Sequence, residues 1–366
     1  MNELQSCFSP TYSDARKRFL NAAGALDATI TSYAIDSQRS PSSLAIDVAT
    51  LGPDDAPALV LTSAVHGIEG FFGSAVQLAL LERFTSSPPI EGLRYVLVHG
   101  INPFGFDQLR RFTEDNVDLN RNFKTPPDPY RGVHSAYRQL DSLINPLSPP
   151  GGIDLFVPKA LWYRWRLTPT AVQHAISCGQ FEYPQGLFYG GSGPAESAQI
   201  VQRHCDQWIG KTDTIVHLDL HTALGPFATY KLLLCDATDA DALDWYETTF
   251  GADSIEPAAG SDLDADRVAF EILGQFGSWM QHHFHDRDYR FMVAEFGTYS
   301  PFRVLKALRA ENRGYHYGYK SDSQKQAIQG ELLECFCPRS PQWRQQVLAS
   351  ALDVIDQATT ALEADR

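Results

Sequence analysis

The stretch ALVLTSAVHGIEGFFGSAVQLALL, residues 58–81, places a strand-length apolar run before a helix-length one. Residues 58–65 have the length and composition of a buried strand, and residues 71–81 those of a helix. His66 and Glu69 lie at the junction, three residues apart. One helical turn brings such a pair to the same side, and zinc accepts an imidazole together with a carboxylate. Taken alone, His-x-x-Glu is common, and the ordinary alternative is a strand-end histidine beside a solvated glutamate.

A second strand-length apolar run at residues 93–99 follows the helix. Strand, helix and strand in this order predict a βαβ unit with parallel pairing. Functional groups in such sheets gather at the carboxyl ends of the strands, where His66 and Asn102 are placed. Other strands are predicted at residues 43–51, 214–221, 229–235 and 290–295.

Helices are predicted near both ends of the sequence. The first spans residues 11–24, with Ser13 or Asp14 as its cap and Gly24 at its end. The last, residues 340–366, reads as an outer helix. Between the strands, residues 125–191 are rich in proline and glycine, which predicts a long loop or insertion with one short helix.

The composition limits the classes of partner. A chain of 366 residues with 43% hydrophobic and 20% charged residues fits a soluble globular protein with a sizeable core. The net charge of −14 argues against nucleic acid and against anionic membrane surfaces as partners. No apolar run is long enough to span a bilayer, and residues 1–10 lack the pattern of a secretion signal. The six cysteines form no Cys-x-x-Cys motif, so we expect reduced thiols and a cytoplasmic location.

A third candidate metal ligand is His221. The alternation in residues 215–221 puts His217, Asp219 and His221 on one face of a predicted strand. Three polar residues on the buried face of an apolar strand need partners. A metal bound by His221, with Asp219 orienting an imidazole, would supply them. For His217 the favoured interpretation is a core histidine with its own hydrogen-bond partners.

Two further stretches carry candidate chemistry. In residues 111–123, Asn120 and Arg121 offer an amide and a guanidinium fork that suit a planar carboxylate, and Arg111 is a candidate to stabilise an oxyanion. The alternative is that these are surface arginines on a loop. Glu295 ends an apolar strand, a position that suits a general base, although a structural ion pair is the alternative.

Taken together and in order, these motifs make the chain resemble a zinc carboxypeptidase-like metallohydrolase. Within that group it is most similar to the DUF2817 family of bacterial proteins. The matching motifs are His66-x-x-Glu69, Asn102-Pro-x-Gly105, Arg111 followed by residues 117–123, Asp219-Leu-His221-Thr222 and Glu295-Phe-Gly-Thr298, with residues 186–191 and 307–312 typical of the subgroup.

The resemblance implies a fold and a set of roles. The fold would be α/β, one domain over residues 1–366 with a mixed, mostly parallel central sheet flanked by helices, and residues 125–191 would shape the pocket. One Zn2+ per chain would be held by His66, Glu69 and His221. A zinc-activated water with Glu295 as general base would hydrolyse the substrate, and Arg111 would polarise the scissile carbonyl. Asn120 and Arg121 would bind the free carboxylate.

The resemblance leaves one residue of the peptidases unassigned. Carboxypeptidases place a flexible tyrosine over the substrate, and Tyr189, Tyr289 and Tyr299 are all candidates here. Extra ligands for a second metal are present in His217, Asp219 and the run at residues 282–285, but this run reads better as a partly exposed helix end.

The predicted function is hydrolysis of amide bonds in small molecules or short peptides that carry a free carboxylate. The alternative is an N-acyl amino acid deacylase of the aspartoacylase or succinylglutamate desuccinylase type, which uses a similar ligand set. A non-catalytic carboxylate-binding or metal-binding protein is a third possibility. A serine hydrolase is disfavoured, because residues 190–194 break the Gly-x-Ser-x-Gly spacing at Pro194.

Overall fold

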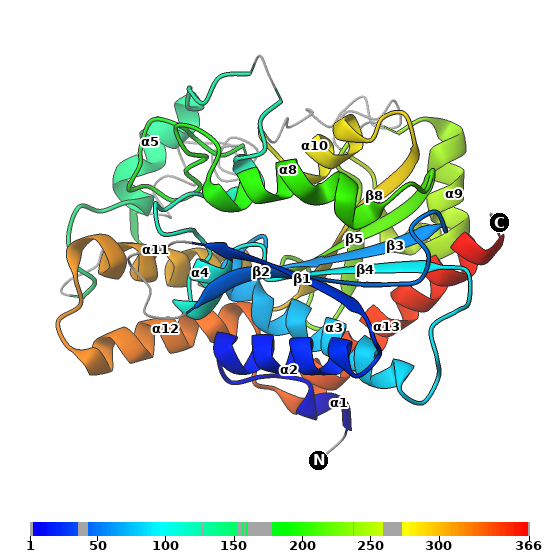
Figure 1. Cartoon of the computed structure of the whole chain (residues 1–366). Coiled ribbons are helices and arrows are strands. Elements are labelled where there is room, and N and C mark those ends of the chain that lie inside the picture. The colour runs from blue at the N-terminus through cyan, green and yellow to red at the C-terminus, as the bar shows by residue number, and fades with distance from the viewer. Residues whose placement is uncertain are drawn as a thin grey trace.

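Eight strands form one sheet across the described part of the chain, in the order β1-β2-β4-β3-β5-β8-β6-β7 (Figure 1). The central strands β4, β3, β5 and β8 run parallel, and β2 and β6 flank them in the opposite direction. The computed structural model describes residues 3–35, 43–125, 128–151, 156, 158–159, 178–236, 238–258 and 273–364. The strands are β1 (Thr29–Ile35), β2 (Leu44–Leu51), β3 (Ala58–Ser63), β4 (Arg94–His99), β5 (Thr214–Ala223), β6 (Tyr230–Leu233), β7 (Ile255–Glu256) and β8 (Asp288–Gly297).

The predicted fold class is confirmed: the chain forms a mixed α/β domain with a largely parallel central sheet. The βαβ unit is present, because β3 and β4 pair in parallel and are joined by α3 (Gly70–Phe84). The edge strand β1 was not predicted. Most of its side chains are exposed, so its sequence carries no buried alternation to reveal it.

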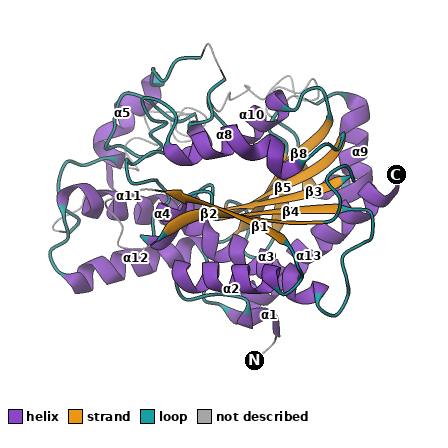
Figure 2. Ribbon diagram, viewed as in Figure 1, coloured by secondary structure: helices purple, strands orange, loops and turns teal. Residues whose placement is uncertain are grey.

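Helices cover both faces of the sheet (Figures 1 and 2). On one face lie α2 (Tyr12–Gly24), α3 and α13 (Pro341–Ala364), and on the other lie α8 (Glu196–Ile209) and α10 (Phe276–His283). Since α3 lies between the sheet and its neighbouring helices, it is apolar around most of its circumference. The remaining helices are α1 (Glu3–Ser6), α4 (Pro103–Asp107), α5 (Ser135–Ile144), α9 (Ala240–Phe250), α11 (Pro301–Tyr317) and α12 (Asp322–Phe336). None of the described helices is both long and apolar enough to cross a membrane.

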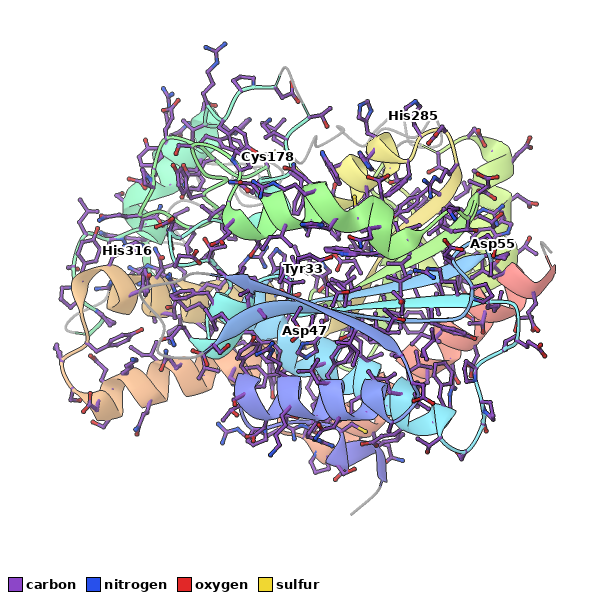
Figure 3. All side chains as sticks on the ribbon, in the orientation of Figure 1. Tyr33, Asp47, Asp55, Cys178, His285 and His316 are labelled. Carbon is purple, nitrogen blue, oxygen red and sulfur yellow. The ribbon has the colours of Figure 1, made fainter. Side chains whose placement is uncertain are left out.

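The N-terminal helix begins at a different cap from the predicted one. Thr11 has an extended backbone and its side chain accepts a hydrogen bond from Asp14 N at 3.1 Å, so Thr11 caps α2 and Ser13 and Asp14 lie inside its first turn. The helix is tied to the sheet by Arg16, which pairs with the buried carboxylate of Asp47 on β2 at 2.7 Å (Figure 3).

The C-terminal helix α13 matches its predicted position and anchors the end of β8. Trp343 is fully buried, and its indole Nε1 donates to the carbonyl oxygen of Gly297 at 2.9 Å. Of the predicted insertion, residues 128–151 and 178–191 are described and include α5, whereas residues 126–127, 152–155, 157 and 160–177 lie outside the description. That the whole insertion shapes the pocket stays a prediction.

The loop after β3 packs backbone to backbone on the loop after β4. Gly67 N donates to Arg111 O at 3.1 Å and Ile68 N donates to Arg110 O at 2.7 Å. A Cβ on Gly67 would lie 2.2 Å from the carbonyl carbon of Gly105, so the loops approach this closely only because residue 67 is a glycine. This contact fixes where His66 and Glu69 sit relative to Arg111.

We expect Gly67→Ala to lower the free energy of unfolding by about 1–3 kcal/mol, because rigid backbone must move to admit the methyl group. Gly24→Ala is the matched control. Its Cβ would meet nothing within 4 Å, so stability should stay the same or rise by up to about 1 kcal/mol. Urea unfolding of both variants makes the comparison. Equal stability of Gly67→Ala and wild type would contradict the close packing of the two loops.

Candidate metal centre and active site

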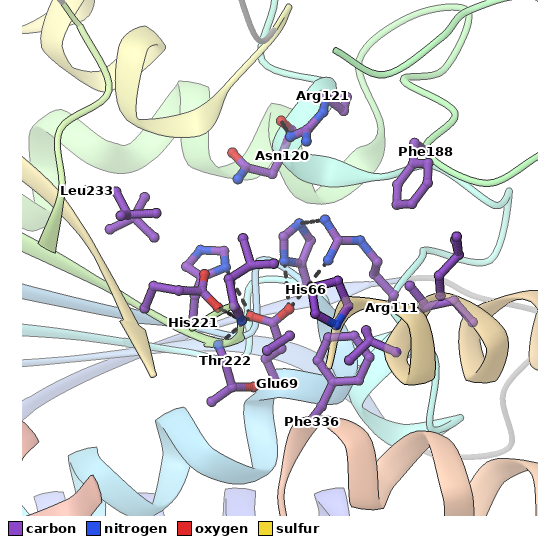
Figure 4. A pocket seen from close by; sticks show the side chains of 18 of the residues that line it. His66, Glu69, Arg111, Asn120, Arg121, Phe188, His221, Thr222, Leu233 and Phe336 are labelled. Atoms are coloured by element: carbon purple, nitrogen blue, oxygen red, sulfur yellow. Dashed lines mark hydrogen bonds and ion pairs between the residues drawn. The ribbon is translucent and has the colours of Figure 1, made fainter. Parts of the chain in front are cut away.

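The three predicted metal ligands meet at the carboxyl ends of β3 and β5 (Figure 4). His66 follows β3, Glu69 ends the short 3₁₀ turn Gly67–Glu69, and His221 lies near the end of β5. All three are buried, and one potential ligand atom from each lies within 4.8 Å of the others. Two imidazoles and a carboxylate are a donor set that zinc accepts, so this group is able to hold a metal ion.

Backbone strain accompanies this convergence. Ala64 has a φ of 61° and Ala223 a φ of 133°, conformations that residues with a side chain rarely adopt. Ala64 is held there by Asn102, whose backbone N donates to the Ala64 carbonyl at 2.8 Å. Such strain costs on the order of 1–3 kcal/mol per residue and concentrates at functional sites. Here it turns the chain beside His66 and His221.

Carboxylates lie on both sides of the two imidazoles. Behind the rings, Asp219 Oδ2 is 2.6 Å from His221 Nε2 and Asp118 Oδ1 is 3.2 Å from His66 Nε2. In front, the Glu69 carboxylate lies 3.0 Å from His221 Nδ1 and 2.9 Å from His66 Nδ1. For His221, the carboxylate behind Nε2 orients the imidazole and leaves Nδ1 as the nitrogen that faces a metal.

The electrostatics of this cluster fit a cation. Burial lowers the pKa of His221, but Asp219 and Glu69 outweigh burial and hold that pKa well above its usual range. Burial raises the pKa of Glu69, but His66 and His221 outweigh it and bring that pKa below its usual range. A divalent cation between these groups would replace protons that the imidazoles otherwise carry, so the charge of the cluster suits a metal.

Glu295 faces the same group from the end of β8. It lies opposite His221 in the parallel ladder between β5 and β8, and its Oε1 accepts a hydrogen bond from Leu224 N at 2.8 Å. Burial, aided by the nearby Glu69 carboxylate, raises the pKa of Glu295 to about 7. A carboxyl group with a pKa near the working pH is suited to take up and return a proton.

Arg111 reaches the cluster from the loop after β4. Asp118 accepts a hydrogen bond from its Nε at 3.0 Å, and Glu69 Oε1 lies 3.5 Å from its Nη1. Its Nη2 lies 2.7 Å from His66 Nε2. Arg111 is therefore held by carboxylates with its guanidinium beside the His66 imidazole, where a cation would stabilise negative charge on an oxygen.

Arg121 is a buried cation that makes no ion pair with the described residues. Its Nη1 donates to the carbonyl oxygen of Asn120 at 2.7 Å, its Nε has no hydrogen-bond partner, and no carboxylate of the described residues pairs with it. Burial lowers the pKa of Arg121, and the Asp118 carboxylate only partly opposes this shift. The side-chain oxygen of Asn120 accepts from Phe276 N at 2.9 Å, which turns the amide NH2 group of Asn120 outward as a donor.

These groups share one cavity of about 230 Å³. Its polar wall holds the candidate ligands, Arg111, Arg121 and Glu295, and its apolar wall comes from the insertion loop, β6, β8 and α11 (Figure 4). The apolar lining residues include Phe188, Leu233, Val293, Val304, Leu308 and Phe336. A small molecule that enters the cavity therefore meets the cluster, a free guanidinium and an apolar wall together.

A family model described as "Protein of unknown function (DUF2817)" matches residues 8–350. The chain belongs to this family. A search of curated protein sequences finds no match to this DUF2817 protein.

Three of the solved structures similar to this DUF2817 protein show the level of likeness. Bovine thrombin-activatable fibrinolysis inhibitor, in complex with tick carboxypeptidase inhibitor, is 11% identical with a TM-score of 0.47, over 94% of this chain and 97% of that chain. Carboxypeptidase A from Helicoverpa armigera is 11% identical with a TM-score of 0.45, over 93% and 73% of the two chains. Succinylglutamate desuccinylase from Chromobacterium violaceum is 14% identical with a TM-score of 0.38, over 88% and 77%.

Among the described residues, no tyrosine lines the cavity of this DUF2817 protein. Tyr289 is buried and its hydroxyl contacts His217 Nδ1 at 2.5 Å, and the Tyr299 hydroxyl donates to Glu334 at 2.7 Å. Tyr189 accepts a backbone hydrogen bond from Asp118 N at 2.7 Å. None of the three candidates therefore lies over the ligands, and the neighbouring Phe188 forms that wall instead.

Two contributors to the site were missed in the sequence. Asp118 contacts both His66 and Arg111, and its pKa is held well below the usual range because Arg111 and His66 outweigh the opposing effect of burial. Its position two residues before Asn120, within the stretch that carries the candidate arginines, was the signal in the sequence for a functional role. The backbone N of Thr222 donates to Glu69 Oε2 at 3.1 Å, and a backbone donor leaves no trace in a sequence.

The extra ligands considered for a second metal are not part of the group formed by His66, Glu69 and His221. His217 and Asp219 are engaged in hydrogen bonds with Thr62. His282, in the last turn of α10, and His285, just after that helix, are exposed, and Figure 3 shows His285 at the periphery. Away from the cavity, Cys205, Asp206 and His283 form another group of possible ligands. Burial raises the pKa of the Cys205 thiol to about 12, which disfavours the thiolate that a metal needs.

We expect the purified DUF2817 protein to hold one zinc ion per chain, lost in both His66→Ala and His221→Ala, since each variant removes one of three ligands. His283→Ala is the control, because it removes a histidine from the other group. Elemental analysis after dialysis measures the metal. Loss of zinc in His283→Ala with retention in the other two variants would place the metal elsewhere.

Proposed function

We propose that this DUF2817 protein is a zinc-dependent hydrolase of amide bonds in small molecules or short peptides that carry a free carboxylate. The observation that carries the proposal is Arg121, a buried guanidinium in the cavity of the candidate metal ligands that makes no ion pair with any described carboxylate and whose Nε has no hydrogen-bond partner. Burying an unpaired charge is costly, and a ligand carboxylate would offset that cost when it binds.

His66, Glu69 and His221 would hold the zinc ion. When bound at such a site, zinc supplies Lewis-acid polarisation and makes water a better nucleophile near neutral pH. Asp219 orients the His221 imidazole from behind at 2.6 Å, and Asp118, which also holds Arg111, lies 3.2 Å from His66 Nε2.

Glu295 is the proposed general base. It would take a proton from the attacking water and return it to the nitrogen of the leaving amine, so that one carboxyl group serves both steps. Its location beside His221 and its pKa near 7 support this role. The Leu224 N–H fixes one carboxylate oxygen, which leaves the other to exchange the proton.

Arg111 and Arg121 are proposed to act on different parts of the substrate. Arg111, fixed by Asp118, would stabilise the negative charge that develops on the carbonyl oxygen during attack. Arg121 and the amide of Asn120 would bind the free carboxylate and so set the distance from the substrate terminus to the scissile bond. That distance is what separates removal of a terminal residue from internal cleavage.

One assay tests the proposal against its alternatives. Zinc-loaded protein is offered peptides with free C-termini, the same peptides amidated, and N-acyl amino acids. Release of the terminal amino acid from the first set supports a carboxypeptidase, and turnover of only the third set supports a deacylase. Tight binding of carboxylates without turnover, or activity that survives chelation, would overturn the proposal of a zinc hydrolase.

We expect Glu295→Gln to lower kcat by about 10²–10⁴-fold while zinc stays bound, because the amide cannot accept the proton. Glu295 must be ionised to act, so wild-type activity should fall as the pH drops through its pKa, at pH 7 or below because a bound cation lowers that pKa. Rate against pH for both proteins, with zinc content measured in parallel, gives the comparison. Near wild-type activity in Glu295→Gln would remove Glu295 from the mechanism.

We expect Arg121→Gln to lower kcat/KM for carboxylate substrates by about 10²–10³-fold, or roughly 3–4 kcal/mol. Its folding stability should not fall, because the variant removes a buried charge that has no partner. The matched control is Arg110→Gln. Arg110 is equally buried but pairs with Glu311 at 2.7 Å, so its loss should cost about 3–5 kcal/mol of stability.

Steady-state kinetics and thermal unfolding separate the two arginine variants. If Arg121→Gln hydrolyses free-carboxylate and amidated substrates in the wild-type ratio, Arg121 does not bind the carboxylate.

A further inference from the structure

A file, that is, an unbroken chain, of side-chain hydrogen bonds runs behind the candidate metal ligands through the interior of the sheet. The Tyr289 hydroxyl lies 2.5 Å from His217 Nδ1, and His217 Nε2 lies 2.9 Å from Thr62 Oγ1. Thr62 Oγ1 donates to Asp219 Oδ1 at 2.6 Å, and Asp219 Oδ2 lies 2.6 Å from His221 Nε2. The file therefore links Tyr289, at one end of β8, to a candidate metal ligand.

The chemistry of the groups sets the direction of every bond. A carboxylate only accepts, so Thr62 donates its single hydroxyl proton to Asp219 Oδ1, and His221 Nε2 donates to Asp219 Oδ2. Because that proton is committed, the Thr62 oxygen accepts from His217 Nε2. His217 Nδ1 is then the acceptor for the Tyr289 hydroxyl. Only one arrangement of protons satisfies all four bonds.

The surroundings of His217 keep it neutral, as this arrangement requires. His217 is fully buried, and the rings of Phe291 and Phe276 pack edge-on against it at 4.5 and 5.7 Å between centroids. Burial lowers the pKa of His217 to about 3, with Asp219 opposing the shift. Neutral His217 offers one donor and one acceptor, and the file uses both.

Strand register puts these groups on one face of the sheet. Thr62 lies opposite Asp219 in the ladder between β3 and β5, and His217 lies opposite Phe291 in the ladder between β5 and β8. Residues directly opposite one another share a face, and every second residue of a strand returns to it. His217, Asp219 and His221 therefore form a row on β5, with Thr62 beside the middle member.

We infer that Thr62 and His217 are positioning residues that hold the Asp219 carboxylate so that His221 keeps its proton on Nε2 and presents Nδ1 to the metal. This inference rests on the proposed metal site. It extends the support of the ligand beyond Asp219 to two side chains that touch neither the ligand nor the cavity. Partners behind a metal ligand of this kind typically affect metal affinity about 10–100-fold.

The test compares Thr62→Val with Thr62→Ser in the zinc-loaded full-length protein. Valine matches the shape of threonine but has no hydroxyl, whereas serine keeps the hydroxyl. We expect Thr62→Val to raise the zinc dissociation constant by about tenfold or more, and Thr62→Ser to restore a value close to wild type. Competition with a chelator measures the constant, and the absorption spectrum of the Co2+-substituted protein reports ligand geometry.

Two further variants complete the design. Thr359→Val, in α13 far from the file, removes a buried hydroxyl that donates to Asp356 O at 3.0 Å, and it should change neither the zinc affinity nor the cobalt spectrum. Tyr289→Phe removes the first donor and should weaken zinc binding by less than Thr62→Val. If Thr62→Val does not fold, the zinc affinity of Tyr289→Phe alone tests whether the file supports the metal ligand.

The outcomes separate this inference from the proposed function. Wild-type zinc affinity in Thr62→Val, with or without a lower melting temperature, would mean that the file only stabilises the fold. Unchanged affinity in Tyr289→Phe would overturn the inference in the same way if Thr62→Val cannot be prepared. Failure of the wild-type protein to bind zinc would overturn the metal site itself.

Discussion

The site depends on one buried carboxylate, that of Glu69. It contacts His66 and His221 from two different strands, accepts the backbone N–H of Thr222 and lies 3.5 Å from Arg111. Burying a carboxylate is unfavourable unless it is paired and hydrogen-bonded, and His66 and His221 are the partners that keep Glu69 ionised inside the protein. The ends of β3 and β5 and the loop after β4 are consequently held together by charge as well as by packing. A metal ion would strengthen the same connection by taking over protons between the same atoms.

The two buried arginines of the loop region show how a structural cation differs from a candidate binding group. Arg110 is paired with Glu311, donates to Asn116 and stacks over Tyr315 with 3.3 Å between its guanidinium carbon and the ring centroid. Arg121 is also buried, but among the described residues it makes no ion pair and its Nη1 donates to the carbonyl oxygen of Asn120. The first arrangement stabilises the fold, because every charge is compensated. The second lowers stability until an anion arrives, which is the usual cost of a preformed binding site.

The parts of this fold that the sequence predicted are those that leave a periodic or compositional pattern. The apolar runs of β3, α3 and β4 predicted a parallel βαβ unit, and His66 and Glu69 between β3 and α3 indicated a candidate site. The edge strand β1 could not be found in this way, because its side chains are mostly exposed. The cap at Thr11 depends on a backbone conformation, and three neighbouring residues of similar capping ability could have supplied it. Local sequence patterns predict buried strands and helices, whereas helix caps depend on the backbone conformation and edge strands depend on the strands beside them.

Residues that act through others were harder to predict, because their partners lie far away in the sequence. Thr62 and Asp219 are separated by 157 positions, and only the register between β3 and β5 places them opposite each other. The alternation in β5 revealed a polar row at His217, Asp219 and His221, but one strand by itself cannot show what satisfies that row. The answer comes from two other strands, through Thr62 on one side and Tyr289 on the other. A buried polar row in an apolar strand therefore needs hydrogen-bond partners on the neighbouring strands. Those partners can be identified only when the order of the strands in the sheet is known.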